Sequence, residues 1–283
     1  MNNDITDNYE KIGYLHQHYK FFHIKDKEDR DFSYHYHDFD KIVYFLDGKA
    51  DYMIEGKQYT LQPYDFVLVN RNEIHKPIVD FSLPYERIIL YIEHEFLEKY
   101  KGTDYDLTGC FVKSLEAGVH VVRFPAPANN QLYEILVRME ENDKKKVYAR
   151  ELYGELLFLE FMILLNSACC EYEMAYNSNV KYNKKVIDMI WFINRNLAED
   201  LSIEVLSERF YISKYHMMRQ FKEETGYSLH QYITEKRILA AKAMLLDGVP
   251  AATAAMECGF NDYSTFARAF KKTLGVIPTS FLK

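Results

Sequence analysis

The sequence lacks the features of a secreted, membrane-spanning or disulfide-stabilised protein. Its four cysteines include no C-x-x-C pair and suggest no disulfide framework, which favours a reducing cytoplasm. Residues 1–9 contain neither a basic segment nor an apolar core, so no signal peptide is expected. The most apolar run, Leu156 to Cys170, is interrupted by Glu160 and Asn166, so no membrane-spanning helix is expected. These absences predict a cytoplasmic protein.

Motifs of common enzyme classes and an overall positive charge are also absent. No Ser-His-Asp or Cys-His spacing and no glycine-rich phosphate loop occurs, so we predict no enzyme activity. The 283 residues carry a net charge of −7. Residues 183–283, however, hold 14 Lys and Arg against 11 Asp and Glu, a net of +3, which leaves −10 for residues 1–182. This division is compatible with DNA binding by a local basic patch, because salt screens distant charges.

One pattern occurs twice in the basic part, Arg-x-Phe-Lys at residues 219–222 and again at residues 268–271. The offset of 49 residues also aligns three further pairs: Ser213 with Asp262, Met217 with Phe266, and Gly226 with Gly275. Serine and aspartate suit the N-cap of a helix, and glycine suits the left-handed residue that ends one. The chain therefore contains an internal repeat built on a capped helix.

A second short helical pattern precedes each copy, at residues 202–210 and at residues 250–258. Short helix, tight turn and capped helix form a helix-turn-helix motif, so two motifs are predicted. The connecting helix, Leu229 to Leu246, is roughly 27 Å long at the α-helical rise. That length approximates the ~34 Å between successive major-groove openings, so one chain could place both motifs in adjacent grooves. The alanine-rich Pro250 to Ala255 predicts looser packing and a weaker or more adjustable DNA contact in the second motif.

The second helix of each motif divides into a core side and a side that we expect to face DNA. Four apolar residues are predicted to face the core: Met217, Phe221, Phe266 and Phe270. Nine residues are predicted to contact DNA: Tyr215, Met218, Arg219, Lys222, Tyr263, Ser264, Thr265, Arg268 and Lys271.

The two arginines could grip either a guanine edge or a phosphate, whereas the two lysines suit phosphates. Tyr215 could contact a thymine methyl group or a sugar, and Thr265 a base edge. The alternative, that Arg-x-Phe-Lys is only a solvated helix face beside a core aromatic, is disfavoured by two copies in register.

The N-terminal half carries six short β patterns separated by turn signals. They are Phe32–His37, Ile42–Leu46, Ala50–Ile54, Gln58–Leu61, Asp65–Asn70 and Arg87–Glu93. Asp47-Gly48 is the strongest hairpin signal, because a two-residue turn needs positive φ at both central positions. Glu55-Gly56-Lys57 marks the next turn. Many short strands at this spacing predict a small sandwich or barrel.

The period changes to helical after residue 130, with Leu132, Ile135, Leu136 and Met139 on one face. A second helix is predicted from about residue 147 to residue 174 and is apolar nearly all round in its centre. Such a helix must be covered on several sides, by its own domain, by a second subunit, or by both. We expect a homodimer formed through residues 130–174.

Residues 201–226 and 249–278 resemble the DNA-binding domain of the AraC/XylS family of bacterial transcription regulators, especially in Gly259-Phe260-Asn261-Asp262. The N-terminal half resembles the cupin-like sensory domain of that family. The matching segments are His35-Tyr36-His37-Asp38-Phe39, Leu46-Asp47-Gly48 and Asn72-Glu73-Ile74-His75. The resemblance implies a seven-helix unit that binds double-stranded DNA as a dimer, and a response to a small-molecule effector. We expect the protein to be an activator.

The predicted fold is an α+β multidomain chain. Residues 1–125 form a cupin-like β-barrel that binds the effector, and residues 126–176 form a helical hairpin that packs on it and dimerises. Residues 177–183 are a linker, and residues 184–283 are an all-α DNA-binding domain.

Barrel mouths bury ligands between aromatic walls and a few polar groups. Six residues are predicted to bind the effector, a sugar or another polar metabolite: Tyr34, His35, Tyr36, His37, Tyr44 and His75. The alternative is a metal-dependent cupin enzyme, because three of these residues are histidines that could hold a divalent metal. Metal-binding cupins usually add a glutamate after the His pair, whereas this chain has Asp40 and Lys41, and a lysine repels a cation. We therefore predict no metal and no cofactor.

Overall fold

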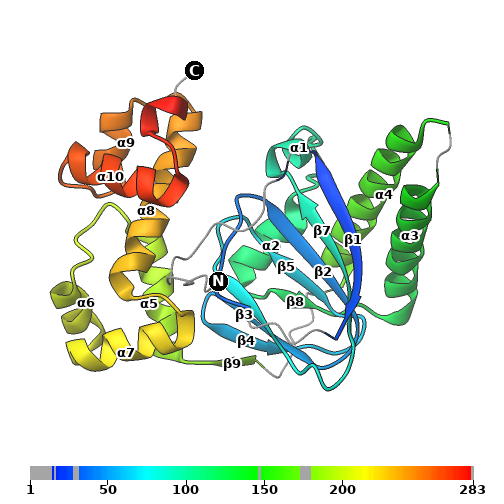
Figure 1. Ribbon diagram of the computed structural model, residues 1–283, viewed down its shortest axis with the longest axis horizontal. Coiled ribbons are helices and arrows are strands. Elements are labelled where there is room, and N and C mark those ends of the chain that lie inside the picture. Colours follow the sequence, from blue (N-terminus) through cyan, green and yellow to red (C-terminus); the bar gives the residue numbers. More distant parts are fainter. Residues whose placement is uncertain (1–14, 16, 28–31, 146–147, 173–179, 282–283) are drawn as a thin grey trace, which may run out of the picture. The chain divides into compact units, whose positions relative to one another are not determined.

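The computed structural model describes residues 15, 17–27, 32–145, 148–172 and 180–281 of the chain. It consists of two compact units, one made mainly of residues 12–54 and 58–181 and the other mainly of residues 182–283. The first holds most of the strands and the second is helical (Figure 1). Of the predicted linker 177–183, residues 177–179 lie outside the described residues. The domain boundaries within 1–176 remain a prediction.

Two sheets form the first unit. The five-stranded sheet has the order β1 (Tyr19–Asp26), β7 (Tyr85–Ile92), β2 (Asp40–Asp47), β5 (Phe66–Val69) and β8 (Val121–Val122). The four-stranded sheet has the order β6 (His75–Val79), β3 (Ala50–Ile54), β4 (Lys57–Thr60) and β9 (Val180–Tyr182). β2 pairs antiparallel with β5 and with β7, so that Tyr44 lies opposite Phe66 on one side and Ile88 on the other.

The predicted closed barrel is wrong, because the sheets remain two separate hydrogen-bonded sets. β2 ends at Asp47 and β3 begins at Ala50 in the other sheet, so the chain changes sheet within two residues. The inner faces meet through alternating apolar residues such as Phe45, Val67 and Tyr52. Face-to-face packing buries this surface without hydrogen bonds along every edge.

The predicted hairpin at Asp47-Gly48 is therefore also wrong. Of the two residues only Gly48 has positive φ, and a Cβ atom there would lie 2.6 Å from the carbonyl oxygen of Pro84. This glycine permits a close approach between chain segments rather than a two-residue turn. The two-residue hairpin lies between β3 and β4, where Glu55 and Gly56 have φ of 46° and 78°.

Four strands, β1, β6, β8 and β9, were not predicted, and one predicted strand is absent. β1 is an edge strand without strict apolar alternation, and β6 contains Pro77, which an edge strand tolerates. β8 has only two residues, and β9 lies within the predicted linker. Of the predicted strand Phe32–His37, only His35 pairs, in an isolated bridge with His75. The other five predicted strands are confirmed. They correspond to β2, β3, β4, β5 and β7, and their ends agree with the prediction within a few residues.

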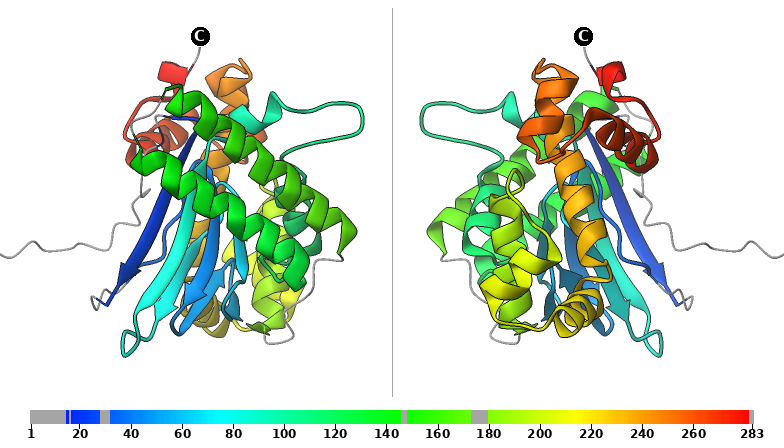
Figure 2. Two further views of the ribbon diagram at one scale, coloured as in Figure 1. Left: turned by 90° about the vertical axis from the view of Figure 1, so that its right-hand side faces the viewer. Right: turned by 90° about the vertical axis from the view of Figure 1, so that its left-hand side faces the viewer.

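Helices cover the outer face of the five-stranded sheet. They are α1 (His94–Glu98), α2 (Gly109–Ala117), α3 (Ala126–Lys144) and α4 (Arg150–Glu171). Figure 2 shows α3 and α4 lying across this sheet. Their buried side chains, such as Leu136, Phe158 and Phe161, share one core with Leu68 and Leu90 of the sheet.

By length and composition alone α4 could cross a membrane, contrary to the expectation from its central run. Its burial shows a different role. Leu157, Phe158, Phe161, Met162 and Leu165 are each at most 1% exposed within the core of this unit. An apolar helix whose side chains fill a protein core is accounted for by that packing.

The second unit contains, in its described residues, six α-helices and a final 3-10 turn. They are α5 (Lys184–Arg195), α6 (Ile203–Phe210), α7 (Lys214–Thr225), α8 (Leu229–Leu246), α9 (Ala251–Glu257), α10 (Tyr263–Leu274) and η1 (Pro278–Phe281). The bounds of α8 are those predicted. Two helix-turn-helix motifs, α6–α7 and α9–α10, are therefore present.

The predicted helix ends are largely confirmed. Gly226 and Gly275 end α7 and α10 in the left-handed conformation, with φ of 75° and 76°. Asp262 caps α10 by accepting a hydrogen bond from the Thr265 backbone N–H at 2.8 Å. Ser213 is the N-cap of α7, but its side chain accepts no capping bond.

Candidate functional site

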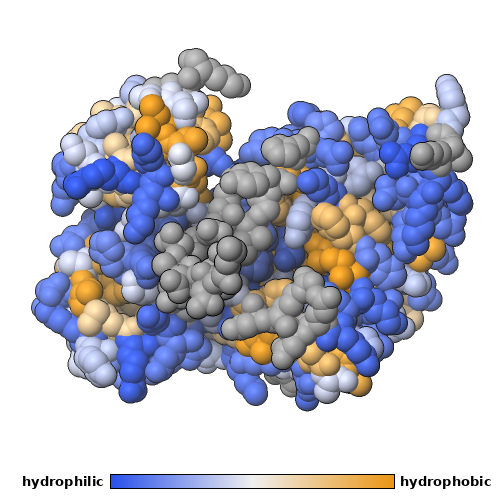
Figure 3. All heavy atoms as spheres, viewed as in Figure 1, coloured by the Kyte–Doolittle hydropathy of each residue, from blue (hydrophilic) through white to orange (hydrophobic). Residues whose placement is uncertain are grey.

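The second helix of each motif presents a polar stripe to solvent. All nine residues predicted to contact DNA are exposed, whereas Met217, Phe221, Phe266 and Phe270 are at most 1% exposed. The predicted division into a core side and an outer side is confirmed. Contact of the outer side with DNA remains a prediction. On the face of the second unit seen in Figure 3, hydrophilic residues predominate and hydrophobic patches are small.

The two arginines of the repeat are held differently. Arg219 lies 3.7 Å from the carboxylate of Glu223, one turn further along α7, in an exposed pair of little strength. Arg268 donates from Nε to the Ser264 carbonyl oxygen at 3.3 Å and from its guanidinium to Thr265 Oγ1 at 3.4 Å. Both side chains lie on the surface, where a phosphate or a base edge could replace these partners.

Both motifs pack on α8. In the first, the ring of Phe221 meets that of Tyr232 with centroids 5.2 Å apart. In the second, Ile238 and Leu245 share a core with Phe266. The connecting helix α8 thus contacts both α7 and α10 and joins the two motifs into one unit.

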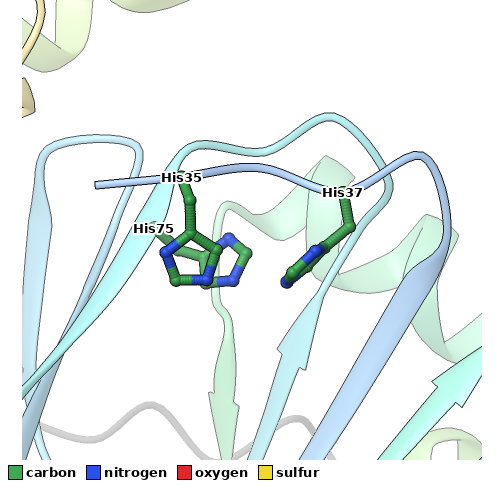
Figure 4. A group of neighbouring side chains, drawn as sticks. All are labelled: His35, His37 and His75. Carbon is green, nitrogen blue, oxygen red and sulfur yellow. The ribbon is translucent and has the colours of Figure 1, made fainter. Parts of the chain in front are cut away.

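A second candidate site is a cluster of three histidines in the first unit. Reciprocal backbone hydrogen bonds of 3.0 and 2.9 Å join His35 and His75 and bring the segment before β2 against the start of β6. The ring centroids of His37 and His75 lie 5.0 Å apart, and those of His35 and His75 lie 4.4 Å apart. One ring nitrogen of each histidine lies within 4.8 Å of the others. Figure 4 shows the three rings close together.

Backbone carbonyl groups set the tautomers of two of these rings. His35 Nδ1 lies 2.9 Å from the carbonyl oxygen of Ser33, and His75 Nδ1 lies 2.9 Å from that of Glu73. A carbonyl oxygen only accepts, so each Nδ1 carries the hydrogen and each Nε2 has a free lone pair. Burial lowers the pKa of His35 to about 4 and that of His75 well below its usual value, with the charge of Lys41 adding to both shifts. Both rings are neutral near pH 7.

Lys41 is a buried lysine beside this cluster. It is 6% exposed, and its Nζ lies 5.7 Å from the centroid of Tyr52 and 5.9 Å from that of Tyr91. Within the described part of the chain it has no hydrogen-bond or ion-pair partner. Burial, assisted by the charge of Arg87, lowers the pKa of Lys41 to about 7.

Sequence reasoning did not place Lys41, Tyr52 and Tyr91 beside the three histidines. The ring centroids of Tyr52 and His75 lie 6.0 Å apart in a stacked arrangement, and those of Tyr91 and His37 lie 5.6 Å apart. A lysine at the start of an apolar strand was the available signal, because such a charge is costly to bury.

The other predicted effector residues do not all join the cluster. Tyr44 points to the opposite face of β2, where its ring lies 4.4 Å from Phe66 and its hydroxyl exchanges hydrogen bonds with Asn129. Successive strand residues face opposite sides, so Tyr44 contacts the helical layer while Lys41 faces the other sheet. Tyr34 is half-buried beneath the Lys76 ammonium, and Tyr36 is buried.

A separate cavity of about 660 Å³ lies between β1 and the helices α3 and α4. Tyr19, Phe21, Asn142, Arg150 and Gly154 are among its lining residues. It contains none of the six predicted effector residues. Three of the six predicted effector residues, His35, His37 and His75, instead lie together in the buried cluster.

Comparisons with known proteins match both units. A family model for an AraC-like ligand binding domain matches residues 18–157, and one for a helix-turn-helix domain matches residues 206–283. The chain is 25% identical over 258 residues to the probable transcriptional regulator LumQ of Photobacterium leiognathi, covering 89% of this chain and 93% of LumQ. It is 22% identical over 253 residues to the transcriptional activator RhaS of Escherichia coli, covering 88% of this chain and 86% of RhaS.

Among solved structures, the chain is similar to the C-terminal domain of AraT, a response regulator from Geobacillus stearothermophilus. The identity is 28%, the match covers 35% of this chain and 84% of that chain, and the TM-score is 0.34.

Proposed function

This chain belongs to the AraC family of helix-turn-helix transcription regulators, and we propose that it activates transcription at specific DNA sites when a small polar metabolite binds its N-terminal unit. The family consists of regulators rather than enzymes, so the alternative of a metal-dependent cupin enzyme is not retained. The observation that carries the proposal is the duplicated motif, whose exposed stripes on α7 and α10 repeat Arg219 and Lys222 as Arg268 and Lys271. A cytoplasmic location follows from this role.

The direct test of the DNA-contacting residues is a gel-shift titration against sites selected from a random duplex library. Arg219→Ala and Arg268→Ala should each weaken specific binding by about 1–3 kcal/mol if the arginines read bases. Arg195→Ala is the matched control, since Arg195 ends α5 outside both motifs and packs on Trp191. Unchanged affinity and sequence preference in both variants would remove the two arginines from the interface.

We place the effector beside His35, His37, His75 and Lys41. A buried lysine amino group without a partner among the described residues favours a ligand with oxygen acceptors, such as a sugar or a carboxylate. A ligand that binds only the folded protein raises the melting temperature, so a thermal-shift screen of sugars and organic acids against the whole chain identifies it. Lys41→Met should abolish the shift. Tyr44→Phe, on the other face of β2, should retain it.

Homodimerisation is proposed through the helical hairpin of residues 126–176. Leu152, Leu156 and Ile163 are 61%, 54% and 55% exposed and lie along one side of α4. A second copy of the chain would remove this apolar stripe from water. In analytical ultracentrifugation, the double variant Leu156→Glu with Ile163→Glu should sediment as a monomer. The control Leu115→Glu, on an equally exposed leucine of α2, should leave the dimer intact.

A further inference from the structure

We propose that His35, His37 and His75 form a binding site for one divalent first-row transition-metal ion, with zinc as the reference ion. This site goes beyond the proposed regulatory function and does not depend on it, because metal binding is measured on its own. It reverses the expectation of no metal, which considered the neighbouring sequence positions rather than the arrangement of the three side chains.

The first support is convergence. Two segments of the chain deliver three buried imidazoles to one point, and one nitrogen of each lies within 4.8 Å of the others. Around a tetrahedral zinc ion with Zn–N bonds of 2.0–2.1 Å, ligand nitrogens are about 3.4 Å apart. Small rotations of the rings about their side-chain torsions would close the difference. The backbone bridge between His35 and His75 would keep the two segments together during these rotations.

The second support is the orientation of the donor atoms. The Nδ1–H groups of His35 and His75 are committed to backbone carbonyl oxygens, which leaves Nε2 as the ligand atom of each ring. Metal-binding histidines characteristically donate their other N–H to such an acceptor, because it fixes the tautomer and the ring orientation. The metal-facing lone pairs are therefore present before any ion arrives.

The third support is an unsatisfied polar atom. His75 is fully buried, and its Nε2 has no hydrogen-bond partner among the described residues. Leaving a buried acceptor unpaired is unfavourable and is rare in native proteins. A metal ion bonded to this lone pair would remove the penalty.

The donor set identifies the class of ion. Three imidazoles suit zinc, copper, nickel, cobalt or iron, whereas magnesium and calcium require oxygen ligands. The group contains only these three histidines within the described residues, so a fourth coordination position stays open. That position would accept water or an oxygen atom of the effector.

Lys41 opposes the ion by charge, and this opposition supplies a specific test. Its ammonium group lies near Tyr52 and Tyr91, whose rings adjoin His75 and His37. Removing the cation with Lys41→Met should tighten metal binding by at least about tenfold, which is the size expected for a dication and a cation several ångström apart even in the dielectric of water. A lysine with a merely structural role would leave the affinity unchanged or lower it.

The experiment uses the full chain, stripped with a chelator and titrated with Co(II), whose visible absorption reports coordination, followed by competition with Zn(II). Saturable binding of one ion per chain is expected. His75→Ala and His37→Ala should each weaken it at least about 100-fold, since even loss of a group that only orients a ligand costs about 10- to 100-fold. His230→Ala, on an exposed histidine of α8, should have no effect.

Absence of saturable binding in the wild type, or full binding in both histidine variants, would overturn the site. Circular dichroism checks that each variant is folded, and the Lys41→Met titration still decides the question if one histidine variant is not. Gel shifts on the same preparations separate the two proposals. A chain that binds DNA but no metal refutes this site alone.

Discussion

The two helix-turn-helix motifs reach the same arrangement by different means. In the first, the turn between α6 and α7 consists of residues 211–213, and Tyr211 takes the left-handed conformation with φ of 51°. In the second, the turn between α9 and α10 is longer, residues 258–262, and Gly259 takes that conformation with φ of 82°. One motif therefore tolerates an unfavourable backbone conformation that the other avoids with glycine.

Their cores differ in the same way. The scaffold helix of the first motif buries Leu206, whereas α9 buries the small residues Ala254 and Ala255. In the second motif aromatic rings fill the core beside these alanines. The ring centroids of Phe266 and Phe270 lie 5.3 Å apart, and the ring of Phe270 also contacts that of Phe281. Small residues on one helix are thus matched by large ones on another, so an alanine-rich sequence does not by itself imply a poorly filled core.

Their surface charges favour the second motif. α7 carries Lys214, Arg219 and Lys222 but also Glu223 and Glu224, a net of +1. α10 carries Arg268, Lys271 and Lys272 with no acidic residue, a net of +3. Because phosphate contacts dominate the affinity of proteins for DNA, α10 should bind the backbone more strongly, contrary to the expectation from its alanines.

The largest effect should come from the glycine of the second turn. A Cβ atom on Gly259 would lie 2.4 Å from the carbonyl oxygen of Leu197, and its φ is positive. Gly259→Ala should destabilise the second motif by at least about 2 kcal/mol, through backbone strain and this clash. Hydrogen exchange in α9 and α10 of the whole chain measures the loss.

Tyr211→Gly is the matched change in the first turn. It should alter stability by less than about 1 kcal/mol, because relief of strain is offset by greater freedom of the unfolded chain. Equal effects of the two substitutions would show that the turns do not differ as described.

A charge exchange between aligned positions should have an intermediate effect. Glu223 and Lys272 occupy equivalent places in the repeat, both exposed near the helix end. Lys272→Glu should weaken DNA binding by about tenfold and reduce the slope of log affinity against log salt by about 1, the loss of one phosphate contact. Glu223→Lys should do the reverse.

Gel shifts at several salt concentrations give both quantities. If Lys272→Glu leaves the affinity and the slope unchanged while Glu223→Lys raises them, the first motif dominates phosphate binding.

The smallest effect should come from the helix caps. The Asp262 side chain accepts bonds that lower its pKa, whereas Ser213 makes no capping bond. Asp262→Ala should therefore reduce protection of α10, and Ser213→Ala should leave α7 unchanged.

The contribution of the Asp262 cap to the stability of α10 depends on pH. Because the folded pKa is lowered, the stabilisation is complete above the unfolded pKa, near pH 4, and is lost as the pH falls through the folded pKa. Asp262→Asn keeps a capping acceptor but should remove this acid sensitivity in exchange measurements. Persistence of the pH dependence in that variant would assign it to another group.

The helix bounds of the second unit were predictable to within a few residues. For the first unit, the sequence predicted a β-rich domain but not which strands pair. Helix bounds depend on side chains three or four positions apart and on caps, so Leu229–Leu246 could be predicted without a fold. Strand pairing is not local. An edge strand such as β1 needs no apolar alternation, and Asp47-Gly48 joins two sheets although its dipeptide is typical of a hairpin.

The candidate sites show the same contrast. The exposed stripes on α7 and α10 follow from helical periodicity, so all nine residues were placed correctly on the surface. The spacing of His35 and His37 suggested a shared face, but their meeting with His75 required the bridge between two chain segments. Tyr44 was grouped with them because it is near in sequence, although its side chain lies on the other face of β2.

By itself the sequence determined the duplicated DNA-binding unit, because repeat, periodicity, caps and glycine stops act within a few residues of one another. Only the tertiary structure decided that the sheets stay open, that Lys41 is buried beside three histidines, and that Tyr44 faces the helices. These outcomes depend on which strands pair and which face each residue takes, and both are set by contacts between distant parts of the chain.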